Sequence, residues 1–279
     1  MLYTANEVNE NINSYILEKL KKYNLNGKLN LATIRVGNNS SDISYEKGII
    51  KKFNSLNLNV INYKYEDNIS ENEFILEIKN IANDKNINSI LIFSNIPNHI
   101  NFEKVKEFIP PFKDVESITS YNISNLIFNN SKYTYCAPMA VMELLDYYDI
   151  NLESKNVVIV GRGNTVGKPL SILMINKHAT VTVCNSKTKN LEEITKRADI
   201  LVSAIGKAHF IDENFVNAGQ IVIDVGVSYV DNKIYGDVNI EKIKDIVKAY
   251  TPTPNGISGI TTSILAKNVV DMYINHFMN

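Results

Sequence analysis

The stretch KNVVIVGRGNTVGKPLSILMINKHATVTVCNSKTK, residues 155–189, decides the fold of this protein. It opens on the apolar run 157–160, whose length and branched side chains are typical of a buried parallel strand. A glycine-rich turn follows, then an apolar helical pattern at 170–174 and a second strand at 179–184. Strand, turn, helix and strand in this order predict a βαβ unit of an α/β protein.

The glycine turn of this unit offers a place for the pyrophosphate of a dinucleotide. Glycines let the backbone approach phosphates, and the helix that follows offers N–H groups and the positive end of its dipole. The spacing is GxGxxxG rather than GxGxxG, because Val166 stands where the third glycine would be. An unrelated tight turn is the alternative, which the flanking strand and helix disfavour. The cofactor contacts expected from this turn are Gly161, Arg162, Gly163, Val166, Gly167 and Pro169.

The end of the second predicted strand indicates which dinucleotide binds. NAD-binding folds usually place Asp or Glu here to hold the ribose 2′-hydroxyl, whereas this chain has NSKT at 185–188. The Lys187 ammonium, a hydroxyl and nearby Arg162 could receive a 2′-phosphate, so we predict NADP rather than NAD. An ordinary solvated lysine is the alternative for Lys187. The cofactor contacts expected on this side are Asn185, Ser186, Lys187, Thr188 and, after a later strand, Gly206.

Composition restricts the class of protein. The chain has 279 residues, 44% hydrophobic and 21% charged, which suits a soluble globular protein of two modest domains or one large one. A net charge of −1 argues against a nucleic-acid partner. Cys136 and Cys184 lack the spacing of a zinc site or a disulfide framework, so we expect no metal. Without a signal-peptide pattern or a long apolar run, we expect a cytoplasmic protein with no membrane partner.

The first part of the chain repeats the α/β alternation. Ser70 and Glu73 have the spacing of a capping box, and Ser41 or Asp42 could cap the preceding helix. A final apolar helix at 260–277 is expected to return to this part. The expected elements are helices at 5–23, 43–56 and 70–82, strands at 29–36, 58–63 and 89–93, and a helix at 138–148 that joins the two halves.

The fold class expected from these patterns is α/β with two domains. An N-terminal α/β substrate domain would comprise residues 1–135 plus 257–279, with the C-terminal helix returning to it. A Rossmann-type dinucleotide-binding domain would comprise residues 136–256.

Several short segments, spread along nearly the whole chain, match the pattern of a known protein family in their order and spacing. They are Val36-Gly37-Asn38 followed by Tyr45, KDV at 113–115, Cys136 with Pro138, GRGNTVGKP at 161–169, TVCNSKTKNL at 182–191, IDVGV at 223–227, GDV at 236–238 and TPTP at 251–254. In these segments the chain resembles the methylenetetrahydrofolate dehydrogenase/cyclohydrolase family of one-carbon metabolism. The resemblance implies oxidation of 5,10-methylenetetrahydrofolate to 5,10-methenyltetrahydrofolate with NADP, then hydrolysis of the methenyl product. It also implies a tetrahydrofolate-type substrate and a homodimer.

The substrate half departs from the family pattern at positions that the family uses. Tyr45 is present, but Ile49 stands where the family has a lysine four residues later, and Phe93 stands where it has a glutamine. Glu116 replaces the second Asp of KDVDG, and Ser117 replaces its glycine. The family's PCTP reads YCAP at 135–138, and its PGGVGPMT reads PNGISGIT at 254–261. The resemblance makes Tyr45 catalytic and places Tyr45, Ile49, Phe93, Glu116, Pro254 and Gly256 at the substrate.

These departures separate the two chemical steps. Hydride transfer requires the reacting carbon to be held against the cofactor, without a protein acid or base. Hydrolysis benefits from a proton-transferring group, which the resemblance assigns to the missing lysine. On a helix, Lys47 and Lys51 would point away from Tyr45, and Lys52 would lie roughly 10 Å further along the axis. We therefore expect cyclohydrolase activity to be lost or much weakened.

Two other functions fit the same sequence. One is an NADP-binding paralogue with a reshaped substrate pocket, which apolar Ile49 and Phe93 favour. The other is a non-catalytic dinucleotide-binding protein, because the glycine turn fits a sensor as well as an enzyme. Folate binding would distinguish the methylenetetrahydrofolate dehydrogenase from the paralogue. Turnover would distinguish it from the non-catalytic protein.

Overall fold

The computed structural model describes residues 1–130, 133–230 and 233–278, and it divides into two compact units. Unit 1 comprises Met1–Glu10 and Tyr135–Thr261, and unit 2 comprises Asn11–Thr134 and Thr262–Asn279. Among the described residues, no helix combines the length and the apolar character that a membrane crossing requires.

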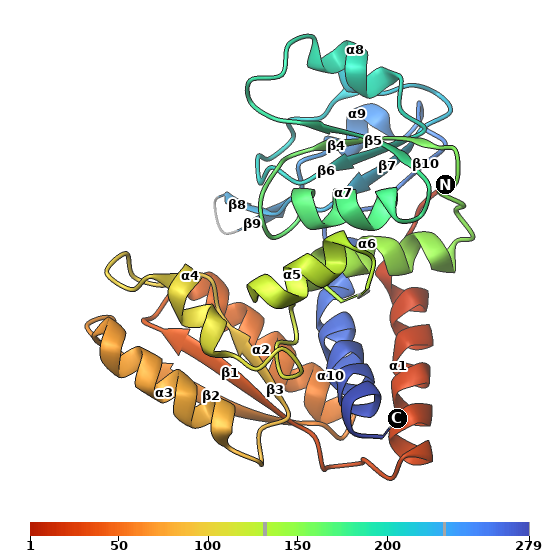
Figure 1. The fold of residues 1–279 in the computed structure, drawn as a ribbon. Helices are drawn as coiled ribbons and strands as arrows, with labels where there is room; N and C mark the ends of the chain where they lie inside the picture. The colour runs from red at the N-terminus through yellow and green to blue at the C-terminus, as the bar shows by residue number, and fades with distance from the viewer. Residues whose placement is uncertain (131–132, 231–232, 279) are drawn as a thin grey trace. The chain divides into compact units, whose positions relative to one another are not determined.

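Unit 1 is built on a five-stranded parallel sheet with the strand order β10-β7-β6-β4-β5. Helix α7 lies on one face of this sheet, and α8 and α9 lie on the other (Figure 1). The chain leaves β4 for β5 on one side and then crosses to β6 on the other. The glycine turn after β4 therefore lies at the switch point of the sheet, where such folds bind ligands. The strands are β4 (Asn156–Val160), β5 (Thr180–Cys184), β6 (Ile200–Ser203), β7 (Ile221–Asp224) and β10 (Ala249–Tyr250).

The helices of unit 1 cover a core of branched residues. Val158, Leu201 and Val222 of adjacent strands pack with Ile243 of α9 and Leu191 of α8. An antiparallel pair of strands, β8 (Ser228–Val230) and β9 (Lys233–Tyr235), forms a separate two-stranded sheet. The helices are α6 (Cys136–Tyr147), α7 (Gly167–Ile175), α8 (Leu191–Lys196) and α9 (Ile240–Ile243).

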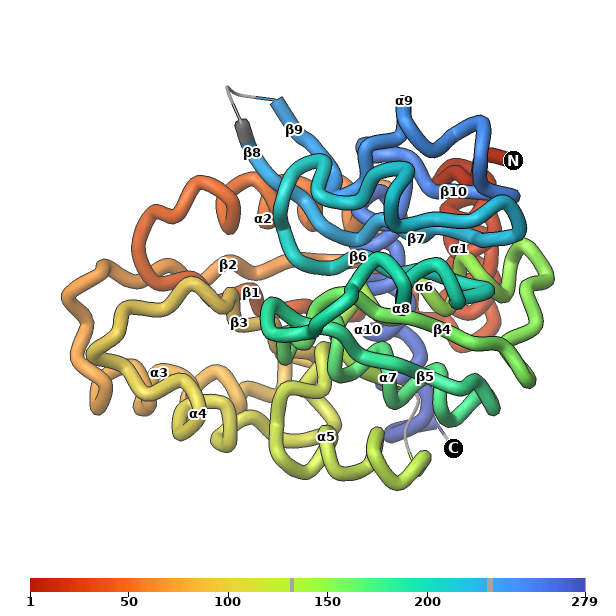
Figure 2. The backbone as a smooth tube through the Cα atoms, turned by 90° about the horizontal axis from the view of Figure 1, so that it is seen from above, coloured from red at the N-terminus to blue at the C-terminus, as the bar shows by residue number. Residues whose placement is uncertain are grey.

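Unit 2 is built on a three-stranded parallel sheet with β1 in the centre, flanked by β2 and β3. Figure 2 shows α2 on one side of these strands and α3 on the other. The strands are β1 (Asn30–Val36), β2 (Asn59–Tyr65) and β3 (Ser89–Ile92). The helices are α2 (Ser40–Ser55), α3 (Glu71–Asn83), α4 (Phe102–Val105), α5 (Ser120–Ile127) and α10 (Thr261–Phe277), with most of α1 (Ala5–Lys22).

Local capping signals explain where two of these helices begin. The capping box of α3 is confirmed, because Ser70 and Glu73 each accept a hydrogen bond from the other's backbone N–H. The expected cap of α2 was wrong: Asn39 caps this helix, and its Oδ1 accepts from the N–H groups of Ser41 and Asp42. Both candidate residues lie inside the first turn, two and three positions after the residue that caps it.

The final helix returns to unit 2 as expected. The Tyr15 hydroxyl donates to Asp271 Oδ1 at 2.8 Å, and Asn268 Nδ2 donates to the Val115 carbonyl at 3.3 Å. Together with the two parallel sheets, this return confirms the expected α/β class with two domains.

The first ten residues group with unit 1, although the sequence-based boundaries placed them in the substrate domain. The Tyr3 N–H donates to the Tyr250 carbonyl, and the Ala5 N–H donates to the Asn255 carbonyl, both at 2.9 Å. The Tyr3 ring also stacks on Tyr148 with centroids 4.1 Å apart. These partners are far away in the sequence, so the periodicity of residues 5–23 contains no sign of them.

Candidate functional site

Two glycines of the turn in unit 1 are required by the backbone itself. Gly161 follows β4 with a φ of +124°, and a Cβ there would overlap the carbonyl of Ala204. Gly167 begins α7, and a Cβ there would overlap the carbonyl oxygen of Gly161. The loops after β4 and β6 therefore pack against each other through bare backbone.

Gly163 is different from its two neighbours. It is exposed, and a Cβ there would meet no atom within 4 Å. Nothing in the described residues therefore demands glycine at this position, and the open space above it suits the close approach of a phosphate.

The start of α7 presents its N-terminal turn without a side-chain cap. Val166 precedes the helix half-buried, and its side chain makes no capping hydrogen bond to the first turn. Pro169 is buried inside this turn, where its missing N–H costs nothing. Arg162 is exposed on the turn itself. This arrangement leaves a helix N-terminus beside a glycine turn, which is the geometry that binds a pyrophosphate.

The segment after β5 forms a closed turn that presents two exposed side chains. Thr188 Oγ1 accepts from the Asn185 N–H at 2.9 Å, and Asn185 Oδ1 accepts from the Lys187 N–H at 3.0 Å. Ser186 and Lys187 are exposed on this turn. Gly206, with a φ of +63°, lies in the loop after β6. All the cofactor contacts expected from the sequence are thus in unit 1, at the carboxyl ends of β4, β5 and β6.

A pair of buried carboxylates, which we did not predict as part of a site, organises this edge of unit 1. Asp237 Oδ2 accepts from Ser203 Oγ and the Ile205 N–H, both at 2.8 Å, and Oδ1 accepts from the Lys207 N–H at 2.7 Å. Asp237 therefore holds the loop that contains Gly206. The GDV segment was visible in the sequence, but the loop that it holds lies about thirty residues earlier.

Asp224 supports Asp237 from the end of β7. Its Oδ1 accepts from the Asp237 N–H at 3.0 Å, and its Oδ2 accepts from the Val238 N–H at 3.1 Å and Thr253 Oγ1 at 3.2 Å. Burial raises the pKa of Asp224 to about 7, and the charge of Asp237 adds to this effect. The N–H donors of Val238 and Asp237 act in the opposite direction.

The raised pKa predicts how pH acts on stability through Asp224. In the unfolded chain an Asp titrates near pH ~3.9, so between about pH 4 and pH 7 the folded state binds the extra proton. The free energy of unfolding therefore falls, through this group, as pH rises across that interval. Asp224→Asn is expected to flatten this slope in urea unfolding followed by circular dichroism.

The matched control is Glu193→Gln, which removes an exposed carboxylate of α8 in the same unit. It should leave the slope as it is in the unaltered protein. A slope in Asp224→Asn equal to that of the unaltered protein would show that Asp224 stays ionised in the fold.

Two of the expected substrate residues of unit 2 meet where α2 passes the end of β3. The ring of Tyr45 stands edge-on to Phe93, with centroids 6.1 Å apart and planes at 86°. Phe93 is buried directly after β3, where its N–H donates to the Ile34 carbonyl. Ile49, one turn after Tyr45, is fully buried.

Glu116 lies half-buried in a loop whose other residues hold the structure together. Lys113 Nζ donates to the carbonyls of Ala82 and Asp84, both at 2.8 Å, and so caps the end of α3. Asp114 accepts from the N–H groups of Ile118 and Thr119. Lys113 and Asp114 of this loop therefore have a structural role, whatever Glu116 contacts.

Pro254 and Gly256, the remaining expected substrate residues, belong to unit 1. Pro254 is exposed and follows a cis peptide bond, and Gly256 is buried. A Cβ at Gly256 would overlap the carbonyl oxygen of Pro252. The structure thus brings Tyr45 and Phe93 together in unit 2 and places these two residues in a tight turn of unit 1.

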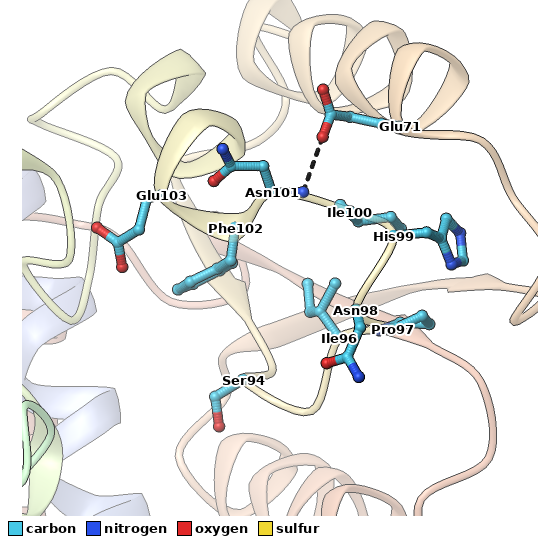
Figure 3. Close-up of a pocket in the computed structure, with 10 residues that line it drawn as sticks. All are labelled: Glu71, Ser94, Ile96, Pro97, Asn98, His99, Ile100, Asn101, Phe102 and Glu103. Carbon is cyan, nitrogen blue, oxygen red and sulfur yellow. Dashed lines mark hydrogen bonds between the residues drawn. The ribbon is translucent and has the colours of Figure 1, made fainter.

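An open pocket of about 500 Å³ lies in unit 2 beside the loop after β3 (Figure 3). The Asn101 N–H donates to Glu71 Oε2 at 2.8 Å across one end of it. Ser94, directly after Phe93, lines this pocket. Among the described residues, none of the expected substrate residues lines it. Across residues 1–130, 133–230 and 233–278, no cluster of metal-binding side chains occurs.

A parallel sheet with a glycine turn at its switch point, joined to a second α/β unit, defines a dinucleotide-binding protein of the α/β class. The chain matches the family model described as tetrahydrofolate dehydrogenase/cyclohydrolase, catalytic domain, over residues 3–116. It matches the NAD(P)-binding domain of the same family over residues 135–277. The chain belongs to this family, as the resemblance in its sequence predicted.

Relatives and solved structures agree with this assignment. The bifunctional protein FolD of Dictyoglomus thermophilum is 43% identical over 264 residues, 94% of this chain and 93% of that protein. A crystal structure of the bifunctional FolD enzyme from Campylobacter jejuni superposes with a TM-score of 0.94 at 32% identity, and covers 99% of both chains. The Trypanosoma brucei enzyme, complexed with NADP cofactor and inhibitor, has a TM-score of 0.92 at 26% identity, and covers 99% of this chain and 97% of that one.

Proposed function

We propose that this protein is an NADP-dependent 5,10-methylenetetrahydrofolate dehydrogenase, which oxidises its substrate to 5,10-methenyltetrahydrofolate. The observation that carries the proposal is the glycine turn at the switch point of unit 1, where the backbone admits only glycine at 161 and 167. Membership of the tetrahydrofolate dehydrogenase/cyclohydrolase family supports the proposal that the substrate is methylenetetrahydrofolate.

NADP is favoured over NAD by the turn after β5. It presents Ser186 and Lys187 to solvent and contains no carboxylate for a ribose 2′-hydroxyl. A 2′-phosphate is a dianion, which an ammonium and a hydroxyl bind well. The NADP complex of the Trypanosoma brucei relative supports the same cofactor.

The residues of the chain do the positioning. The glycine turn and the first turn of α7 would hold the pyrophosphate, while Asp237 holds the loop around Gly206 in place. When bound there, NADP would supply the acceptor for the hydride. The half-buried ring of Tyr45, packed edge-on against buried Phe93, offers an aromatic surface in unit 2 that suits a flat heterocycle. No acid or base is required at the carbon that loses the hydride.

We further propose that the second step, hydrolysis of the methenyl product, is slow in this protein. Ile49 is fully buried and apolar where the family has its lysine. The other lysines of α2 do not replace it: Lys47 and Lys51 are exposed, and Lys52 Nζ reaches Asn13 of α1 at 3.4 Å. A hydrolysis that needs a proton-transferring group therefore lacks the family's residue.

The test follows absorbance in a mixture of purified protein, methylenetetrahydrofolate and either NADP or NAD. We expect NADPH to appear and methenyltetrahydrofolate to accumulate. NADPH without the methenyl product, after subtraction of spontaneous hydrolysis, would contradict slow hydrolysis. Reduction of NAD alone would contradict the cofactor choice, and no reduction of either would favour a reshaped pocket or a non-catalytic protein.

We also propose a homodimer, as the family resemblance implies. The edge strand β5 leaves Val183 38% exposed, and Ile175 of the adjacent α7 is 50% exposed. Unpaired strand edges with apolar side chains are surfaces that a second copy can cover. Light scattering that returns the mass of one chain would contradict this proposal.

A further inference from the structure

Helix α2 places two carboxylates on its buried face. Asp42 is 6% exposed and Glu46, one turn later, is 3% exposed. Ile49 and Phe53 continue the same buried face. Carboxylates at such depth require partners, because burial without a hydrogen bond or a counter-charge is costly.

Glu46 has its partners within unit 2. Arg35 Nε of β1 lies 3.9 Å from Oε2, and Lys64 Nζ of β2 lies 3.8 Å from the same oxygen. Thr33 Oγ1 donates to Oε1 at 3.4 Å. Its charge is therefore balanced by the strands beneath the helix, and Glu46 has a structural role.

Only one of the two carboxylate oxygens of Asp42 accepts a hydrogen bond within the described residues. Its Oδ1 accepts from Asn95 Nδ2 at 2.6 Å, whereas its buried Oδ2 has no hydrogen-bond partner among the described residues. Burial raises the pKa of Asp42, and the charge of Arg35 acts in the opposite direction. A buried acceptor without a partner calls for an explanation, such as a ligand that supplies the missing donor.

The position of Asp42 indicates which ligand that is. It lies on the same helix as Tyr45, three residues earlier, and its partner Asn95 lies two residues after Phe93. The rings of Tyr45 and Phe93 contact each other. Asp42 therefore lies at the carboxyl ends of β1 and β3, the edge where parallel sheets bind ligands.

We propose that Asp42 is a substrate-binding residue whose free oxygen accepts a hydrogen bond from an N–H group of the reduced pterin. Asn95 positions the carboxylate by holding its other oxygen. This proposal rests on the proposed function. It adds a contact that selects nitrogen heterocycles with an N–H donor. A carboxylate here rejects ligands that present an acceptor, because two acceptors would face each other.

The test measures KM for methylenetetrahydrofolate and for NADP in the purified full-length protein. Asp42→Asn can keep the contact to Asn95 and then turns an N–H donor toward the substrate's donor. KM for the folate should rise about 10-fold or more, as for a lost hydrogen bond to a charged group. KM for NADP, bound by unit 1, should stay unchanged, and kcat should change by less than about threefold, because the contact is a binding contact.

Two further variants keep the proposal falsifiable. Glu18→Gln removes an exposed carboxylate of α1 in unit 2 and should leave both KM values unchanged. Asn95→Ala changes an exposed residue and releases the Asp42 carboxylate, so KM for the folate should rise several-fold even if Asp42→Asn does not fold.

The outcomes separate this proposal from the function on which it rests. If the unaltered protein turns over and Asp42→Asn has an unchanged KM for the folate, the role of Asp42 alone is overturned. If Asp42→Asn is unfolded, an unchanged KM for the folate in Asn95→Ala has the same meaning. Absence of both folate binding and turnover in the unaltered protein would overturn the proposed function, and this contact with it.

Discussion

Replacing Gly161 by alanine is expected to abolish NADP binding and to destabilise unit 1 by about 2–6 kcal/mol. The φ of +124° lies in a region that side chains rarely adopt, at a cost of about 1–3 kcal/mol. The new Cβ would also overlap the carbonyl of Ala204, and overlap with rigid backbone costs about 1–3 kcal/mol more. Relief of this overlap would separate the loops after β4 and β6 and so deform the cofactor turn.

Thermal unfolding by circular dichroism and calorimetric titration with NADP measure these two effects. Gly163→Ala is the matched control, because a Cβ there meets no atom within 4 Å. It should unfold at the same temperature as the unaltered protein and yet bind NADP more weakly, since only the phosphate approaches this glycine. A Gly161→Ala variant with unchanged stability and unchanged NADP affinity would show that the turn is not the cofactor site.

Replacing Ile49 by lysine is expected to raise the rate of methenyl hydrolysis about 100-fold or more, the scale of general acid–base catalysis. The side chain at 49 is fully buried, so desolvation would lower the pKa of the new ammonium toward the working range of a proton-transferring group. Glu46, three residues earlier on the same face of α2, could partner the ammonium. The dehydrogenase step should change little, because it needs no such group.

The measurement is the decay of methenyltetrahydrofolate absorbance with and without protein. Ile49→Met controls for altered packing, since it fills a similar volume without an amine, and it should leave hydrolysis slow. Equal hydrolysis by Ile49→Lys and Ile49→Met, with both variants folded, would refute the account in which one missing lysine limits the second step.

Local patterns were enough to predict most of the architecture. The βαβ unit around residues 155–189 and the capping box at Ser70 were both confirmed, because strand, helix and cap preferences depend on neighbours within a few residues. The family was likewise evident from short segments in a constant order. Helix α5, helix α8 and the hairpin of β8 and β9 were not predicted, since short elements have little periodicity.

The same local signals misjudged details that depend on distant partners. Ser41 and Asp42 are both good capping residues, but Asn39 begins the helix, and Asp42 instead turns to Asn95, 53 residues away. The structure describes where the expected substrate and cofactor residues lie, while their contacts with substrate and cofactor stay predictions.

By itself, the sequence determined the α/β class, the glycine turn and the membership of the tetrahydrofolate dehydrogenase/cyclohydrolase family, because these depend on residues adjacent in the chain. Only the tertiary structure decided which buried polar groups have hydrogen-bond partners. It made Lys113 a cap of α3, set Asp224 and Asp237 behind the loop at Gly206, and left one oxygen of Asp42 without a donor. The physical reason is that a buried polar atom is satisfied by whichever segment the fold brings to it, and that segment is far away in the sequence.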